Sequence, residues 1–456
     1  MERLNDEQRN AVHAAIEGKN IFITGPGGTG KSYLLSVLVK ELKKVGRRVT
    51  VTAMTGCAAL LLELQAKTLH AWAGIGLGRG SIDSLVAGIV QHYPRKKRWT
   101  NTDCLIVDEI SMLTPGLLET LDKIGRFVRK KPQQPMGGLQ VIFVGDFYQL
   151  PPVSRDGPAD RTFAFQTPVW QQIIEETHQL RTIFRQQDPV FQQILGEARQ
   201  GALSPESIAL LESRKNMAWK GQLIRPTLVF TRNADVSEIN SKQFNKLPSE
   251  IHTFVARTAL PDSKSKGKDA TAWNELFDKS RSEKIKKIEA DYKEVIEKMD
   301  RDAPYTPNLQ LKVGAQVMLI TNLNFETGLV NGSRGIVKGF CETNGEPFVQ
   351  FLNTVAPIRI EPHKWESDTE PAFCREQIPL RLAYSVTIHK AQGASLDSAL
   401  VDIGPATFEY GQAYVALSRV RSLAGLWVYD LDPRAFRVHP AVREFYSALD
   451  TCDTVE

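Results

Sequence analysis

The chain has 456 residues, of which 42% are hydrophobic and 24% charged, a composition typical of globular proteins with several domains. Its net charge of +5 is too small to identify a polyanionic partner, and no apolar run approaches the ~20 residues of a membrane-spanning helix. The polar start MERLNDEQRN is unlike a secretory or organellar leader, and the five dispersed cysteines form no zinc or disulfide pattern. These features predict an intracellular protein that does not enter a membrane.

A glycine-rich segment, GPGGTGKS at 25–32, fits the pattern G-x-x-x-x-G-K-[ST]. It follows a β-rich run at 21–24 and precedes apolar residues at helical spacing, which favours a P-loop over an ordinary glycine-rich turn. In a P-loop, backbone N–H groups surround phosphate oxygens, while the lysine reaches the β- and γ-phosphates and the hydroxyl meets Mg²⁺. We therefore expect ATP and Mg²⁺ as ligands. The cradle residues are Gly27, Gly28, Thr29, Gly30, Lys31 and Ser32.

A second apolar run, residues 104–107, ends in the carboxylate pair Asp108-Glu109. Behind a P-loop, a neighbouring strand of this kind supplies the metal ligand. Asp108 can therefore hold Mg²⁺, directly or through a water, and Glu109 can orient and deprotonate an attacking water. The alternative is an acidic pair that is merely solvated at a strand end.

A third strand is predicted at 141–144, and it leads into GDFYQLPPV at 145–153. Because the carboxyl ends of parallel strands line the ligand crevice, Gln149 is expected near the γ-phosphate. Its amide can bond to that phosphate or to the attacking water and lose the partner after hydrolysis, so we interpret Gln149 as a sensor. Pro151 and Pro152 would stiffen the outgoing chain so that it moves as a unit. An ordinary turn with a buried amide is the alternative.

The second half of the chain is expected to supply cations to the same phosphates. Arg185 lies in QLRTIFRQ, and Arg419 lies in YVALSRVRS at 414–422. An arginine that reaches across a cleft from another domain stabilises charge on the departing phosphoryl group and couples domain closure to hydrolysis. Ordinary surface arginines are the alternative for both positions.

Several segments, taken in order, resemble those of the Pif (petite integration frequency) family of DNA helicases, in the 5′-to-3′ branch of superfamily 1, with RecD and Dda as more distant relatives. The segments are LNDEQ (4–8), GPGGTGKS, TAMTGCAA (52–59), TLHAWAGIG (68–76), DEIS, GDFYQLPPV, FRQ (184–186), AYSVTIHKAQGASLD (383–397) and VALSR (415–419). The resemblance covers residues 4–422. It is most specific in GDFYQLPPV, TIHKAQGASLD and VALSR.

The resemblance implies an α/β fold with two RecA-like P-loop domains and ATP in the cleft between them. It assigns Gln8 to the adenine edge, Gly393 to the nucleotide, and Gln149 to the coupling of hydrolysis with movement. Arg185 and Arg419 become arginine fingers in cis. The implied domains are 1A at 1–62 and 105–177, a wedge element 1B at 63–104, 2A at 178–260 and 379–456, a charged helical insertion at 261–305, and an SH3-like β-barrel 2B at 306–378.

The same motifs imply a path for single-stranded DNA over both motor domains, on the face away from ATP. Trp72 is a candidate for stacking on a base, which suits a motor that traverses any sequence, and packing in the core is its alternative. The basic cluster PRKKR at 94–98 is expected in a loop, where it is solvated, touches duplex phosphates or acts as a localisation signal. The other candidates for DNA contact are Thr55, Gly56, Thr68, His70, Thr387, His389 and Lys390.

Together these features predict an ATP-dependent 5′-to-3′ DNA helicase, monomeric in solution, that acts on single-stranded DNA and on duplex DNA with a 5′ tail. G-quadruplexes and RNA–DNA hybrids are further candidate substrates. The expected compartments are the nucleus or mitochondrion of a eukaryote, or the cytoplasm of a bacterium. The alternatives are an ATP-switched clamp on single-stranded nucleic acid that does not unwind, and a P-loop kinase.

Overall fold

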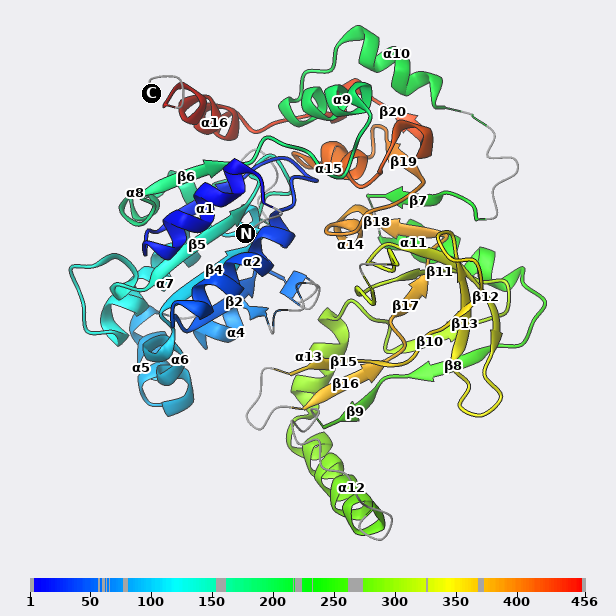
Figure 1. Cartoon of the computed structure of the whole chain (residues 1–456), viewed down its shortest axis with the longest axis horizontal. Coiled ribbons are helices and arrows are strands. Elements are labelled where there is room, and N and C mark those ends of the chain that lie inside the picture. The colour runs from blue at the N-terminus through cyan, green and yellow to red at the C-terminus, as the bar shows by residue number, and fades with distance from the viewer. Residues whose placement is uncertain are drawn as a thin grey trace. The chain divides into compact units, whose positions relative to one another are not determined.

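The computed structural model describes residues 4–55, 58–59, 62, 64, 66–76, 81–152, 161–215, 217, 224–231, 233–260, 274–324, 327–367 and 373–452. The chain folds into two compact units. The first contains Met1–Lys220, Pro226–Asn233 and Val386–Glu456, and the second contains Gly221–Arg225 and Ala234–Ser385. Figure 1 labels the helices and strands of both units.

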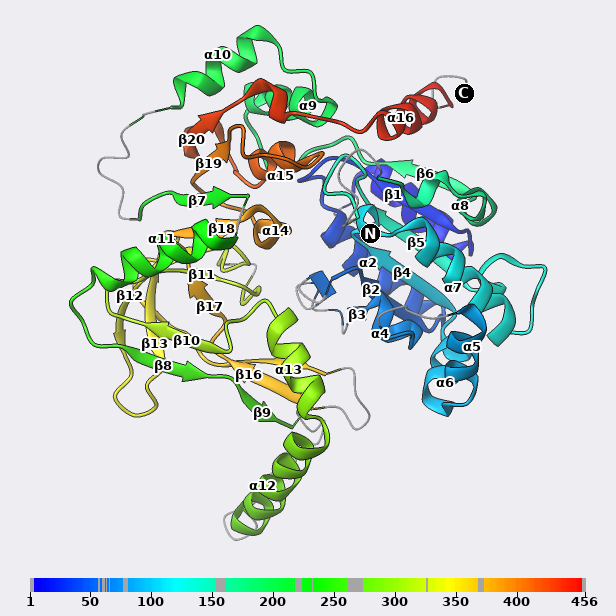
Figure 2. The same ribbon diagram turned by 180° about the vertical axis from the view of Figure 1, so that it is seen from behind.

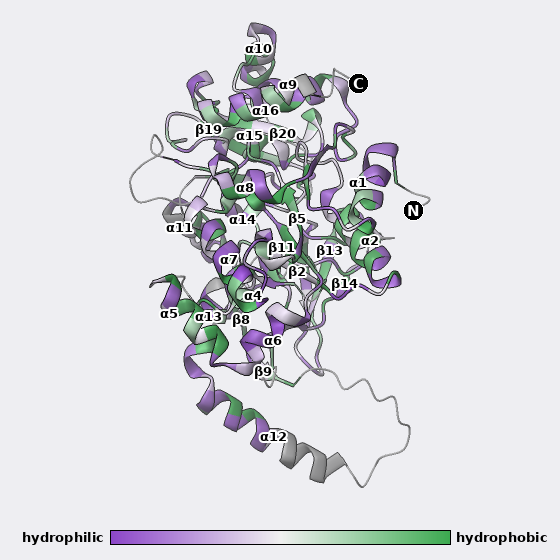
Figure 3. Cartoon of the chain, turned by 90° about the vertical axis from the view of Figure 1, so that its left-hand side faces the viewer, coloured by the Kyte–Doolittle hydropathy of each residue, from purple (hydrophilic) through white to green (hydrophobic). Residues whose placement is uncertain are grey.

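A parallel sheet forms the centre of the first unit, with the strand order β3-β2-β4-β5-β1-β6. Its strands are β1 (Ile21–Thr24), β2 (Val49–Ala53), β3 (Lys67–Thr68), β4 (Cys104–Asp108), β5 (Gln140–Gly145) and β6 (Glu176–Gln179). The central strands are continuous apolar runs, as a parallel sheet covered on both faces requires, and β5 is drawn in the hydrophobic colour in Figure 3. The strands predicted at 21–24, 104–107 and 141–144 are confirmed.

Helices cover both faces of this sheet because successive strand residues point to opposite sides. Ile21 and Ile23 pack in one core with α1 (Asp6–Ile16) and α2 (Lys31–Lys44). Phe22 lies in the other core, with α7 (Pro115–Val128) and α8 (Pro168–Ile173). Other helices and 3₁₀ turns of this half include α4 (Leu69–Ala73), α5 (Ile82–Val90), α6 (Tyr93–Asn101), η1 (Ile110–Met112), η2 (Pro135–Gly137) and η3 (Ala164–Gln166).

The segment PRKKR lies within helix α6, so the loop predicted for it is wrong. Pro94 sits in the first turn, where a missing N–H leaves no helical hydrogen bond unmade, and the lysines and arginines after it are good helix formers. The helix is fixed from within by Trp99, which is fully buried and donates its indole N–H to the carbonyl of Ala73 at 3.0 Å.

A smaller sheet, with the order β18-β7-β19-β20, completes the first unit. Its strands are β7 (Thr227–Phe230), β18 (Ser385–Thr387), β19 (Ala399–Ile403) and β20 (Leu426–Leu431), which all lie within the residues that the resemblance assigns to domain 2A. Its helices and 3₁₀ turns are α9 (Pro189–Gln200), α10 (Pro205–Ser213), α14 (Ile388–Ala391), α15 (Gln412–Ser418), η4 (Leu423–Gly425) and η5 (Pro433–Ala435).

The last helix, α16 (Pro440–Cys452), returns to the main sheet. Its residues Val442 and Tyr446 are buried in the same core as Phe22 and Trp170. The C-terminal segment is therefore part of the packing that supports the P-loop strand, although it lies beyond the last motif of the sequence resemblance.

The second unit is built mainly from antiparallel strands, which lie side by side in Figures 1 and 2. One five-stranded sheet has the order β14-β13-β12-β11-β17, and two smaller sheets are β10-β8 and β15-β16-β9. Val317, Val337 and Val349 share its core, as expected of a small barrel. The elements are α11 (Asn233–Asn245), β8 (His252–Val255), β9 (Arg257–Ala259), β10 (Asn308–Leu311), β11 (Gln316–Leu319), β12 (Arg334–Phe340), β13 (Pro347–Phe351), β14 (Ile358–Arg359), β15 (His363–Glu366), β16 (Cys374–Gln377) and β17 (Leu380–Leu382).

Two helices, α12 (Asn274–Asp291) and α13 (Lys293–Asp302), form the described part of the charged insertion, with a break at Tyr292. Asp300 anchors α13 through an ion pair with the guanidinium of Arg375 at 2.7 Å. The coloured part of α12 is mostly hydrophilic in Figure 3. Nowhere in the described ranges does a helix have both the length and the hydropathy of a membrane span.

Candidate functional site

The glycine-rich segment has the geometry of a phosphate cradle. It leaves the end of β1, and α2 begins directly at Lys31 with Gly30 as its N-cap at φ 79°. Gly28 also has a positive φ, 95°, which a larger residue rarely adopts. The first N–H groups of this 14-residue helix lack intrahelical partners, so they and the helix dipole favour an anion. The loop backbone is fixed in part by Thr29, whose hydroxyl donates to the carbonyl of Pro26 at 3.0 Å.

Lys31 is partly buried near carboxylates at the mouth of this cradle. Its Nζ donates to the carbonyl oxygens of Gly25 (2.6 Å) and Pro26 (2.9 Å). Burial lowers the pKa of Lys31 from 10.5 to about 8, and the nearby carboxylates, Asp146 foremost, oppose that shift. A phosphate group bound beside Lys31 would stabilise the charged form of its side chain.

Asp108 is the last residue of β4 and Glu109 follows it, near the P-loop lysine, as predicted. Burial, and then the charge of Glu109, raise the pKa of Asp108 from 3.8 to about 7. A divalent cation beside these two carboxylates would offset the repulsion between their charges. The side chain of Ser32 is exposed nearby, at the start of α2. Ser32 and Asp108 therefore fit the oxygen ligands that Mg²⁺ takes together with substrate phosphates.

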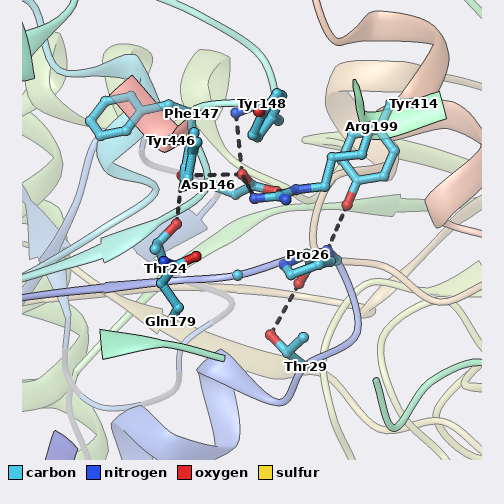
Figure 4. A network of polar contacts seen from close by, with 12 residues as sticks. Thr24, Pro26, Thr29, Asp146, Phe147, Tyr148, Gln179, Arg199, Tyr414 and Tyr446 are labelled. Atoms are coloured by element: carbon cyan, nitrogen blue, oxygen red, sulfur yellow. Dashed lines mark hydrogen bonds and ion pairs between the residues drawn. The ribbon is translucent and has the colours of Figure 1, made fainter. Parts of the chain in front are cut away.

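The turn GDFYQ is held by a buried polar network, drawn in Figure 4. Asp146 is fully buried and accepts two hydrogen bonds from Arg199 of α9, at 2.9 and 3.1 Å. Tyr446 of α16 donates to Asp146 at 3.3 Å, and its hydroxyl also meets the hydroxyl of Thr24 at 2.6 Å. The network thus joins the last residue of β1 to the turn after β5. Gly145 permits a close approach of the turn that follows β4, because a Cβ at Gly145 would lie 2.9 Å from the backbone nitrogen of Ile110.

Gln149 is buried in the same turn, with 5% of its surface exposed, and its backbone N–H donates to the carbonyl of Asp146 at 2.9 Å. It lines a small pocket with Tyr148, Pro151 and Tyr410. The turn also packs tightly against the second half of the chain, because a Cβ at Gly411 would lie only 2.3 Å from the carbonyl oxygen of Tyr148.

Both predicted arginines lie at the P-loop, although they are far from it in sequence. The backbone N–H of Arg185 donates to the carbonyl of Gly28 at 3.2 Å, and its Nη1 donates to the carbonyl of Ser418 at 3.0 Å. A Cβ at Gly27 would lie 3.2 Å from Nη2 of Arg419. Burial lowers the pKa of Arg185 to about 9, with Arg419 as the next cause. Neither guanidinium forms an ion pair with a carboxylate of a described residue, so a polyphosphate would complement both.

Three contacts at this site were not predicted from the sequence. The backbone N–H of Gly27 donates to the hydroxyl of Tyr414, which is buried in α15, at 2.8 Å. Nε2 of Gln392 donates to Oε2 of Glu109 at 2.9 Å. Gln392 and Tyr414 lie inside quoted motifs, next to Gly393 and five residues before Arg419, so their motifs were the available signal. The third contact, between Arg199 and Asp146, has no sequence signal.

One side of the cradle holds Gln8, which the resemblance assigns to the adenine edge, and an exposed aromatic ring. Gln8 is 2% exposed, and its amide is engaged twice: Nε2 donates to the carbonyl of Thr29 at 3.2 Å, and Oε1 accepts from the backbone of Asn5 at 3.3 Å. Phe184 is 52% exposed and lies within van der Waals distance of a Cβ at Gly30. Gly393 directly follows Gln392 and has φ 80°. An aromatic face beside the cradle is suited to a nucleotide base.

The predicted DNA-contacting threonines share one local role. Thr68 and Thr387 are the N-caps of α4 and α14, accepting hydrogen bonds from Ala71 (3.2 Å) and Lys390 (3.3 Å). Thr55 likewise accepts a hydrogen bond from Ala58 at 3.1 Å. Gly56 lies outside the described residues. Each hydroxyl therefore orders its own turn and retains a proton to donate.

His389 and Lys390 have exposed side chains on α14, and His70 is half-buried on α4. Trp72 is 1% exposed, so base stacking by Trp72 is wrong for this structure. Its ring packs against Trp99 with centroids 4.6 Å apart, and its indole N–H donates to Thr102 at 3.4 Å. The physical reason is that the ring fills the core under α4 and α6.

Comparisons with known proteins agree with this geometry. The model of the PIF1-like helicase family matches residues 3–201, and that of the Pif1 helicase 2B domain matches 294–340. The chain is 37% identical over 450 residues to the ATP-dependent DNA helicase PIF1 of Homo sapiens, covering 98% of this chain but only 64% of the human protein's length.

Solved structures of Pif1 helicases are also similar to this chain. The crystal structure of Pif1 helicase from Candida albicans is 32% identical, with a TM-score of 0.75, and the match covers 98% of this chain and 100% of that one. Pif1 helicase from Bacteroides in complex with ADP-AlF3 and ssDNA is 27% identical, with a TM-score of 0.61, covering 98% of this chain and 97% of the other.

Proposed function

Because this chain belongs to the PIF1-like helicase family, we propose that it is an ATP-dependent DNA helicase that moves 5′-to-3′ along single-stranded DNA and unwinds duplex. The observation that carries the proposal is the meeting of Arg185 and Arg419 at the P-loop, since both come from the chain beyond the main sheet. Because elements from two sheets form the site, loss of the γ-phosphate can change the contact between these sheets. The ligands named for the Bacteroides relative, a nucleotide analogue and ssDNA, support the same assignment.

The residues of the site would have different roles in ATP hydrolysis. The P-loop amides and Lys31 would bind the β- and γ-phosphates. Glu109 would take a proton from the attacking water, and Arg185 with Arg419 would stabilise charge on the γ-phosphoryl oxygens. Ser32 and Asp108 would hold Mg²⁺, which supplies charge neutralisation when bound. Gln8, Phe184 and Gly393 would contact the rest of the nucleotide.

Movement would follow from the loss of the γ-phosphate. Gln149 lies in a turn that packs against Gly411 and, through Asp146, bonds to Arg199 of α9. A shift at Gln149 is therefore transmitted to the second sheet. Alternation between closed and open contacts would then ratchet the strand held by the DNA-contacting residues, which are Thr55, Gly56, Thr68, His70, Thr387, His389 and Lys390.

The test is strand displacement by the full chain, which we propose to be a monomer, on duplexes with a 5′ or a 3′ tail. We expect ATP-dependent unwinding of the 5′-tailed duplex alone. Lys31→Ala should abolish ATP turnover and unwinding, whereas Gln149→Ala should bind nucleotide but uncouple hydrolysis from unwinding. ATP hydrolysis without strand separation would identify a clamp instead, and a requirement for a 3′ tail would reverse the polarity. Phosphate transfer to a small acceptor without DNA would identify a kinase.

A further inference from the structure

The short helix α14 places two kinds of residue next to each other. His389 and Lys390 expose their side chains on its surface, and Gln392, two positions later, reaches Oε2 of Glu109 at 2.9 Å. Ile388 and Ala391 are buried, and Thr387 caps the turn. A displacement of His389 and Lys390 would therefore also move Gln392, because the buried residues and the cap hold the short helix together.

Glu109 is held in an unusual conformation at the other end of this link. Its φ is 54°, in the left-handed region that residues other than glycine seldom adopt. Strained backbone of this kind occurs mainly where the surroundings impose it, often at active sites. The charge of Glu109 also acts on the pKa values of Lys31, Asp108 and Arg419, which places its carboxylate at the centre of the cluster.

The hydrogen bond from Gln392 bears directly on the ability of Glu109 to act as a base. An amide N–H on a carboxylate oxygen fixes the direction in which the carboxylate points. General base catalysis depends on this direction, because the base must lie within hydrogen-bond reach of the water that it activates. Any movement of Gln392 therefore changes the rate of water activation.

We propose that Gln392 is a positioning residue that links polynucleotide phosphate binding at His389 and Lys390 to the aim of Glu109, so that ATP hydrolysis responds to DNA. The inference rests on the proposed function, since it requires DNA phosphates at α14. Linkage adds a second consequence, because a coupling between two sites acts equally in both directions for binding. Nucleotide binding should therefore alter DNA affinity through the same residue.

The experiment compares the full chain with its Gln392→Leu variant, which keeps a similar volume but cannot donate. The ATPase rate is measured with and without oligo(dT). We expect the ratio of the two rates to fall about tenfold in the variant, as for loss of a hydrogen bond to a charged group, while KM for ATP changes less than about twofold. The change in oligo(dT) affinity caused by a non-hydrolysable ATP analogue should shrink as well.

Gln193→Ala is the matched control, because Gln193 also donates its amide to a carboxylate, that of Glu197 at 3.0 Å, but on the exposed face of α9. This variant should keep the ratio of the unsubstituted chain. A Gln392→Leu variant that keeps the full ratio, or loses the rates with and without DNA by one common factor, would overturn the inference. If the unsubstituted chain itself shows no stimulation by oligo(dT), the proposed function fails instead.

Discussion

Lys31 illustrates how the surroundings of one side chain set the pH range of nucleotide binding. Its ammonium group faces the carboxylates of Asp146, Glu109 and Asp108 and the guanidinium of Arg199, and burial lowers its pKa to about 8. The charged form attracts phosphate, so affinity for ADP should fall as the pH rises through about 8. The free energy of unfolding should have the opposite dependence on pH. The pKa of Lys31 in the folded chain is below 10.5, so the unfolded chain binds more protons between about pH 8 and 10.5, and stability rises with pH over this range.

The measurement is ADP affinity without Mg²⁺ from about pH 7.5 to about pH 9.5, a range that lies above the pKa of about 7 of Asp108. Lys31→Ala should bind more weakly at the lower pH and lose the dependence. A flat profile for the unsubstituted chain would show that Lys31 is not the group that titrates.

The features that the structure confirms are the ones that depend on local sequence. The strand, glycine-rich loop and helix around Lys31 are contiguous, so spacing alone places the cradle. The bond between Gln392 and Glu109 joins residues 283 positions apart, and no local pattern specifies it. For Trp72 the sequence could not distinguish base stacking from packing in the core, because an aromatic ring suits both. The neighbouring helix α6, whose Trp99 packs against Trp72, determines that the ring is buried.

At the scale of elements, the main finding is that α9 and α16 support the turn after β5. Arg199 of α9 and Tyr446 of α16 both bond to Asp146, and the guanidinium of Arg199 also lies 4.2 Å from the ring centre of Tyr148. Neither helix belongs to a motif that indicated this role. Their contact with the turn follows only from the packing of segments that are distant in the sequence.

We expect Arg199→Met to destabilise the fold by about 3–5 kcal/mol, because it leaves the carboxylate of Asp146 buried and unpaired. Asp146→Asn should cost less, and the double variant should recover part of the loss. Thermal unfolding of the two single variants and the double variant measures the interaction between the two residues. Strictly additive losses would mean that the ion pair does not couple the turn to α9.

At the scale of the whole molecule, the first unit contains both the P-loop sheet and the sheet that carries α15. The parallel strands and the small barrel of the second unit were predictable because each is a series of short apolar runs with clear turns. The predicted limits of domains 1A, 1B, 2A and 2B stay predictions, because they depend on long-range contacts that composition does not encode.

The central claim is that one nucleotide is held jointly by the P-loop and by the arginine at the end of α15. Single-turnover hydrolysis of ATP by Arg419→Ala in the presence of oligo(dT) tests it, with Arg421→Ala as a control from the same segment. We predict a loss of about 10³-fold or more in the hydrolysis rate with ATP affinity changed only a few-fold, and a near-normal rate for the control. An undiminished rate in Arg419→Ala would contradict the account.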